Sequence, residues 1–85
     1  MDKKTIKNIK GRAQPLEPSI HIGKEGITEN IVAEVSKQLK KHKIVKVRLL
    51  QNMEMDRREA GVRLAEAADA VMIEVRGRTV VLAKK

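Results

Sequence analysis

The stretch Ile20–Thr28, IHIGKEGIT, constrains the fold most, because it places the signals of a strand, a tight loop and a helix start in direct succession. The alternating run Ile20–Ile22 predicts a brief strand. Gly23 and Gly26 then bound a short loop, and glycine adopts backbone dihedrals that are closed to other residues. Thr28 is a favoured N-cap residue. We therefore predict strand, loop and helix in that order.

The predicted loop is suited to a phosphate group. Peptide N–H groups at the start of the following helix point outward and carry partial positive charge. Lys24 adds a full charge at the loop tip. Glu25 opposes an anionic partner, so we expect it to point away or to help cap the helix. A glycine pair alone often marks only a turn, and a plain connection between strand and helix is the simpler alternative.

The rest of the chain alternates between helical and strand patterns. Helices are predicted over Asp2–Ala13, Glu29–Lys41 and Met55–Ala68, and further strands over Ile44–Leu50, Val71–Arg76 and Thr79–Ala83. Pro15 and Pro18 separate the first helix from the first strand, because proline cannot continue a helix. Gly77, at the first of two turn positions, favours a type II′ turn in the closing hairpin.

This order of elements predicts an α/β fold with a four-stranded mixed sheet. Strand-helix-strand units favour parallel pairing with right-handed crossovers, and the hairpin adds an antiparallel pair. We expect the helices to cover one face of the sheet. At 85 residues the chain holds one domain, residues 1–85.

The charge balance indicates a polyanionic partner. The chain has 19 Lys and Arg against 11 Asp and Glu, a formal net charge of +8. RNA, DNA and an acidic membrane all fit such an excess. Phe, Trp and Tyr are absent, so nucleic-acid binding must rest on phosphates and sugars, helped by arginine planes, rather than on aromatic rings. Duplex DNA ranks lower, because no recognition helix or dimer pattern is present.

The sequence gives little support for an enzyme active site or a metal site. Neither serine has a nucleophile motif around it, and the two histidines lack cysteine or clustered acids nearby. Glu54, Asp56 and Glu59 form only a loose candidate cluster for magnesium. We therefore expect no catalytic residue, no metal site and no cofactor. Without cysteine or a long apolar run, the expected location is the cytoplasm.

The stretch Lys10–Thr28, KGRAQPLEPSIHIGKEGIT, resembles the opening of the CRM domain (chloroplast RNA splicing and ribosome maturation), whose free-standing prokaryotic form is the YhbY-like protein. In that family a basic helix and an Ala-x-x-Leu-x-Pro connector lead into a strand, a Gly-Lys-x-Gly loop and threonine. The similarity continues through Ile44–Val47 and Gly77–Leu82. One departure is Ala83, where bacterial relatives often carry a tyrosine that could stack.

The resemblance implies a non-catalytic RNA-binding domain that is similar in fold to the C-terminal domain of bacterial translation initiation factor three. It also implies a role with the large ribosomal subunit or its precursor, with ribosomal RNA or pre-rRNA as partner. We further expect no membrane association and a monomeric state. The candidate RNA-binding residues are Lys10, Arg12, Gly23, Lys24, Glu25, Gly26, Lys46 and Arg48.

The basic candidates outside the loop follow from the expected fold. We include Lys10 and Arg12 because the connector should return the first helix near the glycine loop. Lys46 and Arg48 share the wetter face of their strand. The alternative function is a protein-interaction adaptor whose basic face docks an acidic protein surface on the ribosome or on an RNA-processing enzyme. Composition does not separate the adaptor from an RNA-binding protein.

Overall fold

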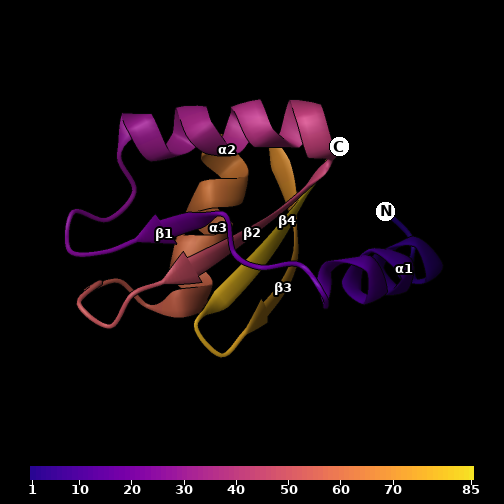
Figure 1. The fold of residues 1–85 in the computed structure, drawn as a ribbon, viewed down its shortest axis with the longest axis horizontal. Helices are drawn as coiled ribbons and strands as arrows, with labels where there is room; N and C mark the ends of the chain where they lie inside the picture. Colours follow the sequence, from indigo (N-terminus) through magenta and orange to yellow (C-terminus); the bar gives the residue numbers. More distant parts are fainter.

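Three helices and four strands follow one another in the predicted order. In the computed structural model, which describes residues 1–85, they are α1 (Lys3–Ala13), β1 (Ile20–Ile22), α2 (Glu29–His42), β2 (Ile44–Leu49), α3 (Arg57–Ala67), β3 (Ala70–Arg76) and β4 (Thr79–Lys84) (Figure 1). The predicted boundaries shift by one or two residues. The predicted α/β fold with its four-stranded mixed sheet is confirmed.

Side-chain caps fix where the first two helices begin. Asp2 accepts a hydrogen bond from the N–H of Thr5 at 2.8 Å, and this bond lowers the pKa of the Asp2 carboxyl below its ordinary value. Thr28 Oγ1 accepts from the N–H of Ile31 at 3.2 Å, so the predicted N-cap of α2 is confirmed. Lys43 ends α2 with a left-handed backbone, at φ 68°.

The sheet has the strand order β1-β2-β4-β3. β1 pairs with β2 in parallel, as predicted for a strand-helix-strand unit. β4 pairs antiparallel with both β2 and β3, so it separates two strands that run in the same direction. In the β3–β4 turn Gly77 has φ +57°, and Arg78 is not in the positive-φ region. A type II′ turn requires this combination, which agrees with the prediction.

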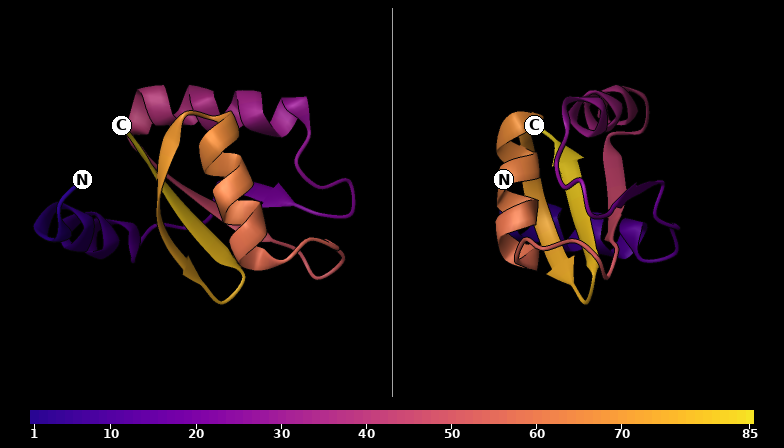
Figure 2. Two further views of the ribbon diagram at one scale, coloured as in Figure 1. Left: turned by 180° about the vertical axis from the view of Figure 1, so that it is seen from behind. Right: turned by 90° about the vertical axis from the view of Figure 1, so that its left-hand side faces the viewer.

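The helices do not all lie on one face of the sheet, and that expectation was wrong. α2 and α3 pack on one face, and Figure 2 shows α3 lying against the strands when the molecule is seen from behind. α1 packs on the opposite face through Ile9 and Ala13, which contact Ile44, Val81 and Ala83. The reason lies in β4, whose run Val80–Ala83 is buried throughout. A continuous apolar strand needs cover on both faces.

α3 approaches the sheet through small residues. Ala60, Gly61, Leu64 and Ala65 are its buried positions. A Cβ added at Gly61 would lie 2.7 Å from Met72 Sδ and 3.2 Å from a Val75 methyl. Glycine in the middle of a helix weakens it, and the close packing of α3 on the sheet explains why this one is there.

Candidate nucleic-acid interface

The predicted glycine loop is a turn at the end of β1. The N–H of Gly26 donates to the carbonyl oxygen of Gly23 at 3.0 Å, and Gly26 has φ +72°. Left-handed backbone of this kind favours glycine. Lys24 and Glu25 occupy the two central positions of the turn, and both are exposed. The loop therefore presents these two opposite charges together at its tip, while the Gly26 amide is already used within the turn.

Gly23 lies where the loop base packs closely against the segment that follows β2. A Cβ at Gly23 would lie 3.1 Å from Asn52 Oδ1 and 3.4 Å from Leu50 Cδ1. The N–H of Leu50 donates to the carbonyl of Ile22 at 2.8 Å, which extends the β1–β2 pairing to the loop. The loop thus has a base fixed to the sheet and an exposed tip.

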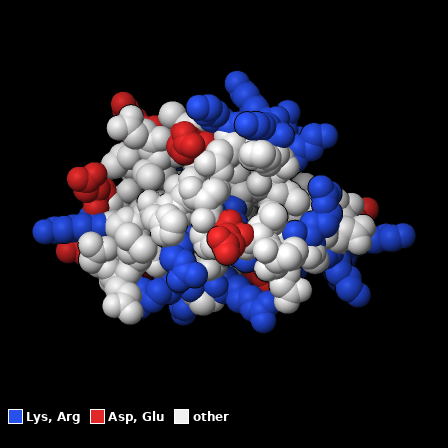
Figure 3. Space-filling model, in the orientation of Figure 1, with Lys and Arg blue, Asp and Glu red and all other residues white.

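Free peptide amides lie next to the loop at the start of α2. The Thr28 hydroxyl oxygen accepts a hydrogen bond from the N–H of Ile31, whereas the N–H groups of Glu29 and Asn30 donate to no protein acceptor. A hollow of about 460 Å³ runs along the loop and this first helical turn. Figure 3 shows red and blue side chains mixed at this end of the molecule. Glu25 makes no hydrogen bond to the helix, so Thr28, not Glu25, supplies the cap.

The first helix does not return near the glycine loop, and that expectation was wrong. α1 and the loop lie at opposite ends of the molecule (Figure 1). β1 begins opposite Val47 of β2 and runs parallel to it, so its loop is carried to the far end of the sheet. The connector is held at the other end, where the N–H of Ser19 donates to the carbonyl of Lys46 at 3.0 Å. Lys10 and Arg12 therefore do not share a site with Lys24.

Lys46 acts as a clamp between β2 and the end of α1. Its ammonium nitrogen lies 3.3 Å from the carbonyl oxygen of Ala13, 3.4 Å from that of Gln14 and 3.0 Å from that of Leu16. Carbonyl groups at a helix C-terminus carry partial negative charge, so they suit a cation. The side chain is half-buried, and its ammonium group donates to three backbone oxygens. Its contact with RNA stays a prediction.

A basic groove runs between the connector and α2. Its volume is about 650 Å³, and it is lined by Arg12, Leu16, Glu17, Ser19, Glu34, Lys37, Gln38, Lys41, His42, Ile44 and Lys46. The predicted contact residues did not include Lys37 and Lys41. The helix dipole alone favours basic residues near the C-terminal end of a helix, so their positions gave no separate sign of a binding site. Their spacing of four places them on one helix face, and this was the signal available in the sequence. Figure 3 shows blue side chains gathered over this part of α2 and over α1.

Lys10 and Arg48 lie outside this groove. Lys10 lines a smaller hollow of about 290 Å³ between the end of α1 and the sheet, together with Arg76 and Thr79. Arg48 is exposed on β2, and its side chain forms no hydrogen bond or ion pair. The structure therefore divides the predicted residues among the loop, the groove, the smaller hollow and the sheet face.

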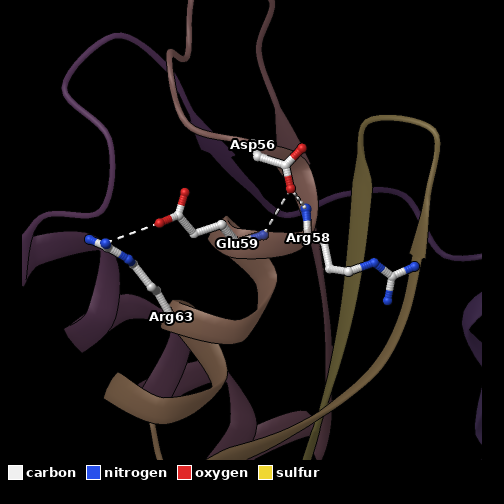
Figure 4. A network of polar contacts seen from close by, with 4 residues as sticks. All are labelled: Asp56, Arg58, Glu59 and Arg63. Atoms are coloured by element: carbon white, nitrogen blue, oxygen red, sulfur yellow. Dashed lines mark hydrogen bonds and ion pairs between the residues drawn. The ribbon is translucent and has the colours of Figure 1, made fainter.

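Two of the three acids that formed the loose magnesium cluster, Asp56 and Glu59, have other partners. Asp56 Oδ2 caps α3 by accepting from the N–H groups of Arg58 at 3.1 Å and Glu59 at 3.3 Å. Glu59 pairs with Arg63 at 3.1 Å, one turn further along the helix (Figure 4). No group of three or more His, Asp or Glu side chains is arranged to hold a metal ion. None of the three helices has the length and apolar character needed to cross a membrane.

Comparison with known proteins gives a consistent result. The model of the CRS1 / YhbY (CRM) domain matches residues 1–84. "Probable RNA-binding protein YqeI" of Bacillus subtilis is 27% identical over 77 residues, which cover 91% of this chain and 80% of that protein. "Probable RNA-binding protein MJ0652" of Methanocaldococcus jannaschii is 34% identical over 76 residues, 87% of this chain but only 56% of that protein.

A solved structure shares the fold. The solution structure of SAV1595 from Staphylococcus aureus, described as "a putative RNA binding protein", superposes with a TM-score of 0.84 at 28% sequence identity. The superposition covers 100% of this chain and 88% of that one.

Proposed function

Because the chain belongs to the CRS1 / YhbY (CRM) domain family, whose model matches residues 1–84, we propose that it binds structured RNA without catalysis. One observation carries the proposal. Of the 19 lysine and arginine side chains, only Arg63 and Lys85 form ion pairs with the protein's own carboxylates. The remaining lysines and arginines have no carboxylate partner within the protein, and RNA is a polyanion that supplies negative charge. The names of the two relatives support RNA as the ligand.

The proposed partner is ribosomal RNA or its precursor, bound during assembly of the large ribosomal subunit in the cytoplasm, with the protein acting as a monomer. This finer proposal is supported by the resemblance of Lys10–Thr28 to the opening of the family's domain. Phosphate contacts from the basic surface supply most of the affinity, because neutralised phosphates release their counterions.

Within this proposal the glycine loop takes one phosphate. Lys24 provides the charge, and the free amides of Glu29 and Asn30 provide donors beside it. Glu25 and Glu29 carry negative charge in the same region. The loop is therefore a positioning contact, and the larger share of the charge attraction falls to Lys10, Arg12 and Arg48 with the lysines of α2.

Lys24→Gln tests the loop contact. We expect the slope of log affinity against log salt to become shallower by about 0.7–0.9, the value of one phosphate contact. Glu25→Gln is the matched control, since it removes the opposite charge from the adjacent position of the same turn and should strengthen binding. An unchanged slope in Lys24→Gln, measured with a transcript of large-subunit ribosomal RNA, would rule out the phosphate contact at the loop.

Crosslinking in cells tests the identity of the partner. Irradiation of cells that express the full chain, followed by sequencing of the attached RNA, should recover large-subunit ribosomal RNA or its precursor. Recovery of protein partners with no RNA adduct would favour the adaptor that docks an acidic protein surface.

A further inference from the structure

One face of the sheet carries a polar row that crosses all four strands. Backbone pairing sets His21 of β1 beside Arg48 of β2, Arg48 beside Thr79 of β4, and Thr79 beside Arg76 of β3. Neighbouring strands lie about 4.8 Å apart, so the four residues span about 14 Å. We call these residues, His21, Arg48, Thr79 and Arg76, the sheet row.

The sheet row lies on the face that bears α1, beyond the part that α1 covers. α1 contacts Ile44 at the start of β2 and Val81 and Ala83 towards the end of β4. Arg48 and Thr79 lie at the opposite ends of those strands, so no helix lies above them. His21, Arg48 and Arg76 are exposed and Thr79 is half-buried.

The charged members of the sheet row have no partner within the protein. Neither Arg48 nor Arg76 forms an ion pair or a side-chain hydrogen bond, and the same holds for His21. Glu74 is the carboxylate nearest along β3 on this face, and it is half-buried and forms no ion pair. The 290 Å³ hollow beside Arg76 and Thr79 is also lined by Lys10, Lys46 and Glu74, so it brings two lysines and one carboxylate to the end of the row.

We propose that the sheet row is a platform for unpaired nucleotides of the RNA, which deepens the proposed function and rests on it. Guanidinium groups bind phosphate through two parallel hydrogen bonds and stack on bases, which lysine does not do. In a chain without aromatic residues, these planes take the place of the rings that line other sheet platforms. The Thr79 hydroxyl and the His21 ring supply polar groups for a ribose hydroxyl.

The composition of the row favours RNA over an acidic protein. Interfaces between proteins are usually built around an apolar centre, and none of the four positions carries an apolar side chain. The row is also an open strip across the sheet, with no helix above Arg48 or Thr79. Single strands can lay successive bases on such a strip, whereas bases within an RNA duplex are already stacked and paired.

The test uses the full chain and two probes, a single-stranded RNA oligonucleotide and the same sequence annealed to its complement. For the double variant Arg48→Gln/Arg76→Gln, we expect the salt slope for the single strand to become shallower by about 1.4, since each phosphate that is no longer neutralised accounts for about 0.7. The double variant Arg48→Lys/Arg76→Lys keeps the charge and should retain the slope. However, this lysine variant should bind the single strand about two- to fivefold more weakly for each arginine that no longer stacks on a base. Duplex affinity should change little in the lysine variant.

Arg63→Gln is the matched control, because Arg63 lies on α3 at the other face of the sheet and is paired with Glu59. Its affinity and slope should equal those of the wild type, and thermal melting of every variant checks that it folds.

If both double variants bind the single strand as the wild type does, the platform is wrong and the proposed RNA binding stands. If the wild type binds neither these probes nor the ribosomal RNA transcript with a salt dependence, the proposed function fails and the platform with it. If it binds the transcript but not the single strand, only the platform is wrong. If a double variant stopped binding an acidic protein partner but bound the single strand as the wild type does, the platform would also be wrong.

Discussion

Replacing the clamp residue Lys46 separates a structural role from a direct role in binding. Lys46→Met keeps the aliphatic stem and removes the ammonium group that reaches the carbonyls of Ala13, Gln14 and Leu16. A hydrogen bond to a charged group contributes about 1.5–3 kcal/mol. Two of the three hydrogen bonds are long, at 3.3 and 3.4 Å, and the carbonyls of Gln14 and Leu16 regain water when the ammonium group is removed.

We therefore expect the lower end, a loss of about 1.5 kcal/mol in the free energy of unfolding. For a domain of this size that corresponds to a fall in Tm of about 6–12 °C. Lys40→Met is the matched control, because the Lys40 side chain is exposed and makes no hydrogen bond, and it should change stability by less than about 0.5 kcal/mol.

The assay is thermal and urea unfolding followed by circular dichroism. A Tm for Lys46→Met within about 2 °C of the wild type would refute the clamp. The salt slope for RNA, measured well below the Tm, provides a second readout. If Lys46 is only a clamp, that slope stays unchanged, whereas if its ammonium group also neutralises a phosphate, the slope becomes shallower by about 0.7–0.9.

Substitutions at three further positions test local features of the fold. Asp56→Ala should cost about 1 kcal/mol in urea unfolding, because two amides at the start of α3 lose their acceptor, and an unchanged midpoint would contradict the cap. Gly26→Ala should cost about 1–2 kcal/mol through backbone strain alone, since φ is +72° and no atom lies near the new Cβ; Gly26→Asn should cost less, and equal losses would point to another cause. The Thr5 amide lowers the pKa of Asp2, so its stabilising effect is present above the ordinary value of 3.8 and is lost as the pH falls through the lower folded value. Acid should therefore reduce the helicity of α1 in the wild type, measured by NMR, and Asp2→Asn should remove this pH dependence.

The elements themselves could be predicted because their signals are local. Thr28 marks the start of α2 within a few residues of the helix it caps, and the strand from Ile44 shows its alternation directly. The closing hairpin likewise follows from the position of Gly77 between two apolar runs. Signals of this kind need no knowledge of how distant segments meet.

What could not be predicted depends on pairing between distant segments. The placement of α1 on the second face needs the knowledge that β4 lies inside the sheet, between β2 and β3. The clamp joins Lys46 to Leu16, thirty positions apart. The sheet row needs the register that sets Arg48 beside Thr79 and Thr79 beside Arg76. The sequence pattern placed Arg48 on the wetter face but gave no reason to connect it with Arg76.

The central claim is that unpaired basic side chains bind RNA through its phosphates. Its most direct test is the affinity of the full chain for a transcript of large-subunit ribosomal RNA, measured over a series of salt concentrations. If about five phosphates are neutralised, log affinity should fall with log salt at a slope of about −3.5 to −4.5. An affinity that does not change across the series would contradict the account.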